Sequence, residues 1–249
     1  MSVGVVLTVG DLVSGGPGNR HSFTDDADTF DRSMDLFGDE SGTLRSVLNG
    51  RDEICVVAVV GGDRMDCIRC PKKAVRRVRD VTEARWSDLM DDQKRRVLDC
   101  MEAEDLQFGV CRITTDALHN LSHSYKLHQD RLSPAWDLVL KGDAYAELVA
   151  AIDSGAQRSR FRFDMVSDRS NAESIVEIVE SGTEVDADWG NSRQIKGIQA
   201  ADCLAGATAD HVRHGEDWID RISTDRIVDR TDAALERLEM ALESTDSGP

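Results

Sequence analysis

The chain has 249 residues, 40% of them hydrophobic, which is enough for one sizeable core. No segment reaches the roughly 18 apolar residues of a membrane span, and no basic residue precedes the mildly apolar residues 3–10. We therefore expect a cytoplasmic protein without a membrane anchor. The formal net charge of −17 and the scarcity of lysine suggest a halophilic protein, since molar salt shortens the screening length to about 3 Å. An ordinary acidic protein is the alternative.

Residues 1–33 are rich in turn-forming and acidic residues and show no periodicity, which predicts a flexible or disordered N-terminal arm. A start codon assigned too early would explain the same segment. Residues 34–214 read as one domain, and residues 215–249 as a C-terminal helix with a short tail. That last helix, apolar at nearly helical intervals from 227 to 242, could cap the core or form a homo-oligomer.

The remaining elements predict an α/β fold with a mixed sheet flanked by helices. A first strand is expected to begin at Met34, and further strands are expected at 54–60, near 65–68, at 106–113 and at 161–166. Helices are expected from Pro71, and at 91–104, 116–128, 135–152 and 171–180, with a last one around Asp202 after a Gly- and Asp-rich loop.

The helix around Asp202 carries one acid among small and apolar residues. Helical spacing places this carboxylate on a face with Ile198, Gln199, Ala205 and Gly206. A carboxylate on such a face costs several kcal/mol unless a basic side chain or a metal ion balances it. Gln199 could bind a ligand, bind Asp39, or serve as a buried structural amide.

A second acidic segment, Asp39-Glu40-Ser41-Gly42, follows the first strand. Strand alternation points consecutive side chains to opposite faces, so Asp39 and Glu40 reach one centre only if the strand has already ended. Both could instead be plain turn residues.

Four segments in this order resemble the domain-of-unknown-function family 3800 (DUF3800) over roughly residues 34–214. They are the Asp39-Glu40-Ser41-Gly42 turn, the Glu83-x-Arg85-x-Ser87-x-Leu89 segment, Asp168-Arg169 at a strand end, and the Gln199-x-Ala201-Asp202-x-x-Ala205-Gly206 helix. Arg85 stands where the family often has lysine.

The resemblance implies a ribonuclease-H-like fold, with an antiparallel first hairpin and then parallel strands, and metal-dependent phosphodiester chemistry. It implies Asp39, Asp168 and Asp202 as ligands of Mg²⁺ or Mn²⁺, with Glu40 or Glu83 completing the site. Short carboxylates suit these hard ions, and two ions about 3.5–4 Å apart can activate water and stabilise a leaving oxygen. Asp168 could instead cap a helix, and Glu83 could be an ordinary solvated side chain.

The nucleic-acid contacts are predicted on a basic stretch that begins with the Pro71 helix. It comprises Lys72, Lys73, Arg76 and Arg77, together with Arg85, in an otherwise acidic chain. A solvated face paired with neighbouring acids is the alternative.

Six cysteines in a chain without a leader do not predict a disulfide framework, and most lie in apolar runs. Cys67-x-x-Cys70 alone has a spacing that suits zinc or redox chemistry, although no second pair completes four ligands. The leading hypothesis is thus a metal-dependent nuclease. Its rivals are a non-catalytic nucleic-acid or protein-binding module on the same fold, and a zinc-binding regulator.

Overall fold

Six strands form one mixed sheet in the computed structural model, which describes residues 34–75, 83–125, 134–153, 159–165 and 169–246. The strands are β1 (Asp35–Ser41), β2 (Ile54–Gly62), β3 (Gln107–Thr114), β4 (Arg160–Asp164), β5 (Asp186–Gly190) and β6 (Ile227–Asp229), in the order β5-β4-β1-β2-β3-β6. Strand β2 is antiparallel to β1 and β3, whereas β4 is parallel to β1 and β5 is parallel to β4. This order confirms the ribonuclease-H-like fold, with its antiparallel first hairpin and later parallel strands.

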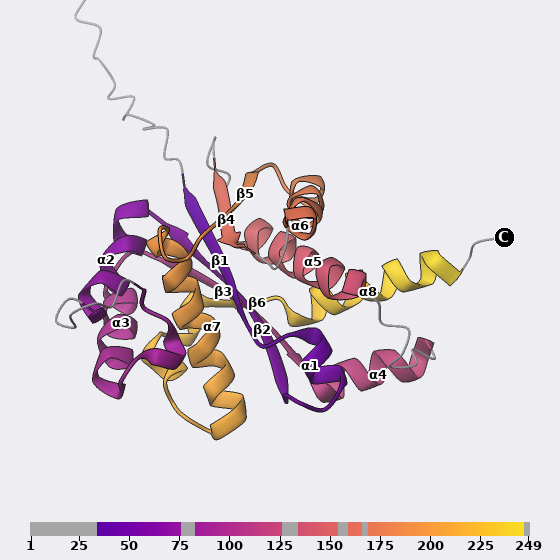
Figure 1. Cartoon of the computed structure of the whole chain (residues 1–249), viewed down its shortest axis with the longest axis horizontal. Helices are drawn as coiled ribbons and strands as arrows, with labels where there is room; N and C mark the ends of the chain where they lie inside the picture. The colour runs from indigo at the N-terminus through magenta and orange to yellow at the C-terminus, as the bar shows by residue number, and fades with distance from the viewer. Residues whose placement is uncertain (1–33, 76–82, 126–133, 154–158, 166–168, 247–249) are drawn as a thin grey trace, which may run out of the picture. The chain divides into compact units, whose positions relative to one another are not determined.

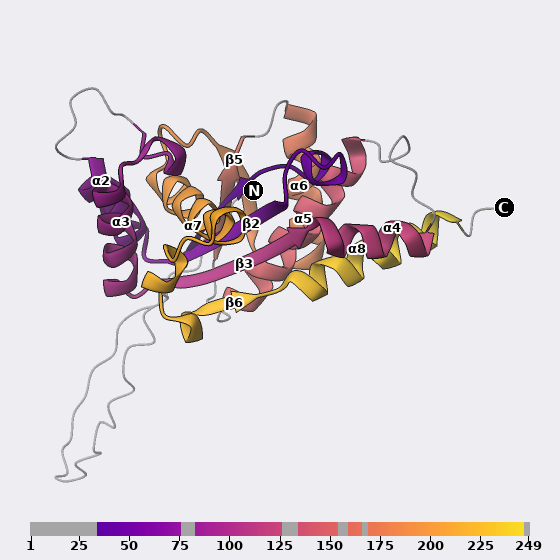
Figure 2. The same cartoon turned by 90° about the horizontal axis from the view of Figure 1, so that it is seen from below.

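Helices cover both faces of the sheet (Figure 1). Helix α7 (Lys196–His214) packs on β1 and β2, with α2 (Arg64–Val75) and α3 (Asp91–Ala103) against it. On the other face, α5 (Pro134–Ile152) packs on β2 and β3 beside α6 (Arg169–Gly182) and α8 (Thr231–Asp246). The described α-helices also include α1 (Leu44–Leu48), labelled in Figure 1, and α4 (Thr115–Tyr125), labelled in Figure 1 and Figure 2. No helix among these residues combines the length and apolar character of a bilayer-spanning segment.

Strand β2 explains why the sheet needs two helical layers. All nine of its residues are buried, because Val56, Ala58 and Val60 face the α7 layer while Val57 and Val59 face the α5 layer. A continuous β-branched run is typical of a strand that is covered on both faces.

Small residues let α7 lie close to the sheet and to the segment before α3. A Cβ atom on Gly197 would come within 2.3 Å of the Phe37 ring, and one on Gly206 would come within 2.3 Å of Trp86. The small-residue pattern around Asp202 is therefore a packing requirement, and it fixes the depth at which Asp202 lies.

Two local predictions were wrong. Residues 65–68 belong to α2, which begins at Arg64 and carries Pro71 in its interior, so that they form no strand and the helix does not start at its proline. The loop before α7 contains β5, a five-residue edge strand whose polar sequence Asp-Ala-Asp-Trp-Gly lacks the β-branched pattern.

The C-terminal segment joins the same structure. Strand β6 pairs with the end of β3, and α8 buries Ala234 and Leu238 on the α5 side of the sheet. Part of this helix therefore caps the core, while its self-association stays a prediction. The predicted arm at residues 1–33 lies outside the described residues.

Candidate metal centre

Asp39 lies near the end of β1 on the face covered by α7. Strand alternation puts it on the side of Phe37, which packs in the α7 layer. The residue is only 9% exposed, and its Oδ1 accepts a hydrogen bond from the Glu40 backbone N–H at 2.8 Å.

Asp202 faces the sheet from the middle of α7. Its Oδ2 accepts a hydrogen bond from the Trp86 backbone N–H at 2.6 Å, and no described lysine or arginine forms an ion pair with it. A backbone donor thus orients this carboxylate without neutralising its charge.

Asp164 ends β4, next to β1 in the sheet. Phe161 and Phe163 pack into the α5 layer, so alternation turns Asp164 to the α7 face, where Asp39 also lies. Its Oδ1 accepts a hydrogen bond from the Ser192 backbone N–H at 3.0 Å.

These three carboxylates, the acid cluster, raise one another's proton affinity. Burial, followed by the charges of Asp202, Glu40 and Asp164, raises the pKa of Asp39 well above its usual range. Burial raises the pKa of Asp202 to about 6, against the lowering effects of the Trp86 N–H and the nearby Arg85 charge, and burial also raises the pKa of Asp164. The cluster is therefore short of positive charge.

The donor set fits a hard divalent cation. In the described part of the chain, one oxygen of Asp39 and one of Asp202 accept no hydrogen bond, and no unpartnered polar side-chain atom is sealed from solvent. Solvent-accessible, anionic oxygens are the ligands that Mg²⁺ and Mn²⁺ prefer. Among the described residues, the oxygens of these three carboxylates do not all come within 4.8 Å of one another, so the cluster is not closed around a single ion.

Glu40 does not join the acid cluster. Strand β1 continues to Ser41, so alternation holds and Glu40 points to the α5 face. There it accepts hydrogen bonds from Lys141 Nζ at 2.6 Å and from the Tyr145 hydroxyl at 3.0 Å. Lys141 thus pairs with Glu40 on the α5 side, while the charge of Glu40 still contributes to the raised pKa of Asp39.

Glu83 lies beside the acid cluster but is already paired. Burial alone would raise the pKa of the Glu83 carboxyl, but hydrogen bonds from Ser192 and Arg85 hold this pKa below its usual range. Arg193 also pairs with it, at 3.3 Å. Glu83 thus differs in charge balance from the three aspartates.

The other predicted residues fall into two groups. Asp168, Arg76 and Arg77 lie outside the described residues. Lys72 is exposed on α2, whereas Lys73 turns to α3, where its Nζ lies 3.2 Å from Cys100 Sγ and 3.4 Å from Glu104.

Sequence reasoning missed Asp164 because the strand was expected to run on to residue 166. The alternation of Phe161 and Phe163 was the available signal, since it assigns residue 164 to the opposite face. Asp168, four residues later, was chosen as the ligand instead because Asp168-Arg169 is the segment that matches the resemblance at a strand end.

Gln199 is a buried structural amide. Its Oε1 accepts a hydrogen bond from Ala84 N–H at 3.0 Å, and its Nε2 donates to the Ser192 carbonyl at 2.7 Å. One side chain therefore holds the segment before Trp86 against the turn before α7.

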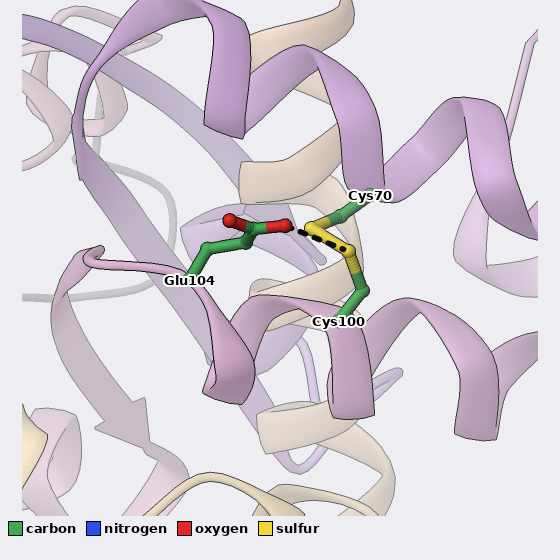
Figure 3. A group of neighbouring side chains, drawn as sticks. All are labelled: Cys70, Cys100 and Glu104. Carbon is green, nitrogen blue, oxygen red and sulfur yellow. Dashed lines mark hydrogen bonds between the residues drawn. A yellow bond between two sulfur atoms is a disulfide. The ribbon is translucent and has the colours of Figure 1, made fainter.

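Three of the cysteines lie on α2 and α3. Cys70 of α2 and Cys100 of α3 are joined by a disulfide, with Glu104 beside it, whereas Cys67 is buried as a free thiol (Figure 3). The sequence was expected to give no disulfide framework, and this single bond was not predicted; Cys100 is nevertheless buried in the core. In this state Cys67 and Cys70 do not act as a ligand pair.

No family model and no curated protein matches the chain. Among solved structures, a chain of the PCNA–ribonuclease HII complex from Archaeoglobus fulgidus aligns with a TM-score of 0.47 and 11% identity, over 87% of this chain and 91% of that one. The ribonuclease H2 from Pyrococcus horikoshii aligns with a TM-score of 0.46 and 16% identity, over 84% and 99%. At these values the matches add no argument to the strand order, on which the fold assignment rests.

Proposed function

We propose that this chain is a divalent-metal-dependent nuclease that hydrolyses phosphodiester bonds of DNA or RNA, and a divergent member of DUF3800. One observation carries the proposal: Asp39, Asp164 and Asp202 gather where α7 covers the sheet, and their pKa values stay raised although the Arg85 charge acts on Asp202, because no described basic side chain forms an ion pair with any of the three. A site of this kind gains stability when cations bind it.

The residues have separable roles in this proposal. Asp39, Asp164 and Asp202 hold Mg²⁺ or Mn²⁺, which when bound supplies an activated water and stabilises the leaving oxygen. The backbone N–H groups of Glu40, Ser192 and Trp86 each hold one carboxylate oxygen and so orient the other. Asp168 and Glu40 are not needed for this arrangement.

The test compares metal binding and cleavage in the same variants. Calorimetric titration with Mn²⁺, and cleavage of labelled DNA and RNA in molar KCl, are measured for the wild type and for Asp202→Asn. We expect Asp202→Asn to abolish both. Asp188→Asn, which removes an exposed carboxylate from the neighbouring strand β5, is the matched control and should change neither.

Two outcomes would contradict the proposal. Mn²⁺ binding that survives Asp202→Asn would place the ion elsewhere. Tight Mn²⁺ binding without cleavage of any DNA or RNA substrate would instead favour a binding module on the same fold. Molar KCl is used because we also propose, from the charge of −17, that the protein works in a salt-rich cytoplasm.

A further inference from the structure

Glu83 is surrounded by hydrogen-bond donors, unlike the three aspartates beside it. Its Oε1 accepts a hydrogen bond from Ser192 Oγ at 2.5 Å and lies 3.1 Å from Arg85 Nε, while its Oε2 lies 3.3 Å from Arg193 Nε. Its side chain is 11% exposed. Both oxygens are thus occupied by this chain's own donors, which leaves Glu83 poorly suited to hold a metal ion.

Among the described residues, the two arginines are held only at Nε. Glu83 contacts Nε of Arg85 and of Arg193, and the terminal nitrogens of both form no hydrogen bond or ion pair with any described residue. Their side chains are 55% and 68% exposed. A guanidinium group fixed at Nε presents its two terminal nitrogens as a planar fork, a geometry that matches the oxygens of a phosphate group.

Each arginine adjoins a residue that orients the acid cluster. Arg85 precedes Trp86, whose N–H binds Asp202, and Arg193 follows Ser192, whose N–H binds Asp164. Gln199 bridges the same two segments through Ala84 N–H and the Ser192 carbonyl. The two chain segments that carry the arginines are therefore fixed beside the cluster by hydrogen bonds of their backbone groups to Asp202, Asp164 and Gln199.

More positive charge gathers at this edge. Lys196 Nζ donates a hydrogen bond to the Arg193 carbonyl at 3.1 Å, and Lys72 at the end of α2 lies close enough to Lys196 to lower its pKa, together with burial. In a chain of net charge −17, cations from three separate segments are thus concentrated beside the carboxylates.

We propose that Glu83 is a positioning residue rather than a metal ligand. The arginine pair that it anchors, Arg85 and Arg193, binds successive phosphate groups of a nucleic-acid strand beside the acid cluster. This inference rests on the proposed nuclease function. Repeated phosphates suit two forks held side by side. A single phosphate group would engage only one of them.

The experiment measures binding without cleavage. In the Asp202→Asn background, fluorescence anisotropy of labelled 20-nucleotide DNA and RNA strands is followed over KCl, from the lowest concentration at which circular dichroism shows the fold intact. Arg85→Ala and Arg193→Ala should each weaken binding roughly tenfold. Each should also reduce the slope of log affinity against log salt by about 0.7, the value for one phosphate contact on a single strand.

Arg96→Ala is the matched control, because Arg96 is also half-exposed and paired with a carboxylate, Asp92, but lies on α3. It should leave affinity and slope unchanged. Equal effects of all three substitutions would mean that only the net charge of the protein affects binding, and this would overturn the inference. So would arginine variants that weaken binding of inorganic phosphate as much as that of the strands.

The role of Glu83 is tested separately by Mn²⁺ titration of Glu83→Gln in the otherwise wild-type chain. Mn²⁺ affinity should fall by less than about threefold, since only a neighbouring charge is lost; a loss comparable with that of Asp202→Asn would make Glu83 a ligand and overturn its positioning role. A chain that binds strands through the arginine pair but never cleaves them would refute the nuclease and keep the inference. Cleavage that is unaffected by removing both arginines would support the nuclease and overturn the inference about the arginine pair.

Discussion

Asp39 and Glu40 are neighbours in sequence, yet their carboxylates lie in opposite electrostatic environments. Asp39 points to the α7 face, where its nearest charges are other carboxylates and its pKa is well above the usual range. Glu40 points to the α5 face, where Lys141 and Tyr145 bind it. One face of β1 balances its charge within the chain, and the other leaves the charge to be balanced from solution.

The balanced side is built into the packing of α5. Lys141 also lies 3.5 Å from Asp137, whose Oδ1 accepts a hydrogen bond from the Leu44 backbone N–H. On α5, Lys141 thus holds β1 through Glu40, and Asp137 holds the start of α1 through Leu44. Glu40 has a structural role here, while Asp39 is kept available for a ligand.

Breaking the balanced pair should have the largest effect on folding. Lys141→Met leaves the partly buried Glu40 and Asp137 without their cation, which we expect to lower the free energy of unfolding by about 3 kcal/mol, measured by urea denaturation.

The control for this prediction is the double variant Lys141→Met/Glu40→Gln. It removes both charges and should recover much of the loss, because replacing a whole buried pair costs less than breaking it. Equal stability of the wild type and Lys141→Met would mean that the pair is screened by solvent.

On the unbalanced side, removing a charge should stabilise the metal-free protein. The folded pKa of Asp202, about 6, exceeds its ordinary value of 3.8, so the folded state binds the proton more tightly and stability falls as pH rises from about 4 through 6. Asp202→Asn removes this dependence. At pH 8 with EDTA we expect the variant to be more stable than the wild type by up to about 3 kcal/mol, and at pH 3.5 to be nearly equal.

Urea denaturation at both pH values measures this difference. Adding Mn²⁺ at pH 8 should reverse the order, since only the wild type binds the ion. A wild type more stable than the variant at pH 8 without metal would show that a cation of the chain already balances Asp202.

The same contrast explains what the sequence could reveal. Asp202 was recognisable because a lone acid among small residues needs a partner, and β2 was recognisable because a continuous β-branched run implies burial on both faces. The fate of Glu40 depends on whether β1 ends before or after it, and strand ends are set by pairing with β2, which local sequence does not encode. The Cys70–Cys100 disulfide joins residues 30 positions apart on two helices, so no local sequence pattern could predict it.

Glu83 shows the remaining gap between sequence and structure. It was expected to be either a ligand or a solvated surface acid, but besides its near neighbour Arg85 its partners are Ser192 and Arg193, more than a hundred positions away. A carboxylate's role follows from its neighbours in space, and for Glu83 these exist only once α7 has packed on the sheet.

The smallest predicted effect separates the two faces most cleanly. Tyr145→Phe removes only the hydroxyl that donates to Glu40 and keeps the ring that packs on Phe161 and Phe163. We expect urea denaturation to show a loss of about 1.5 kcal/mol, typical of a hydrogen bond to a charged group, with Mn²⁺ affinity unchanged. In Glu40→Gln the same substitution should cost less, because the acceptor is then neutral. If Tyr145→Phe weakened Mn²⁺ binding, the two faces of β1 would be coupled, and the division between a structural and a ligand-binding carboxylate would fail.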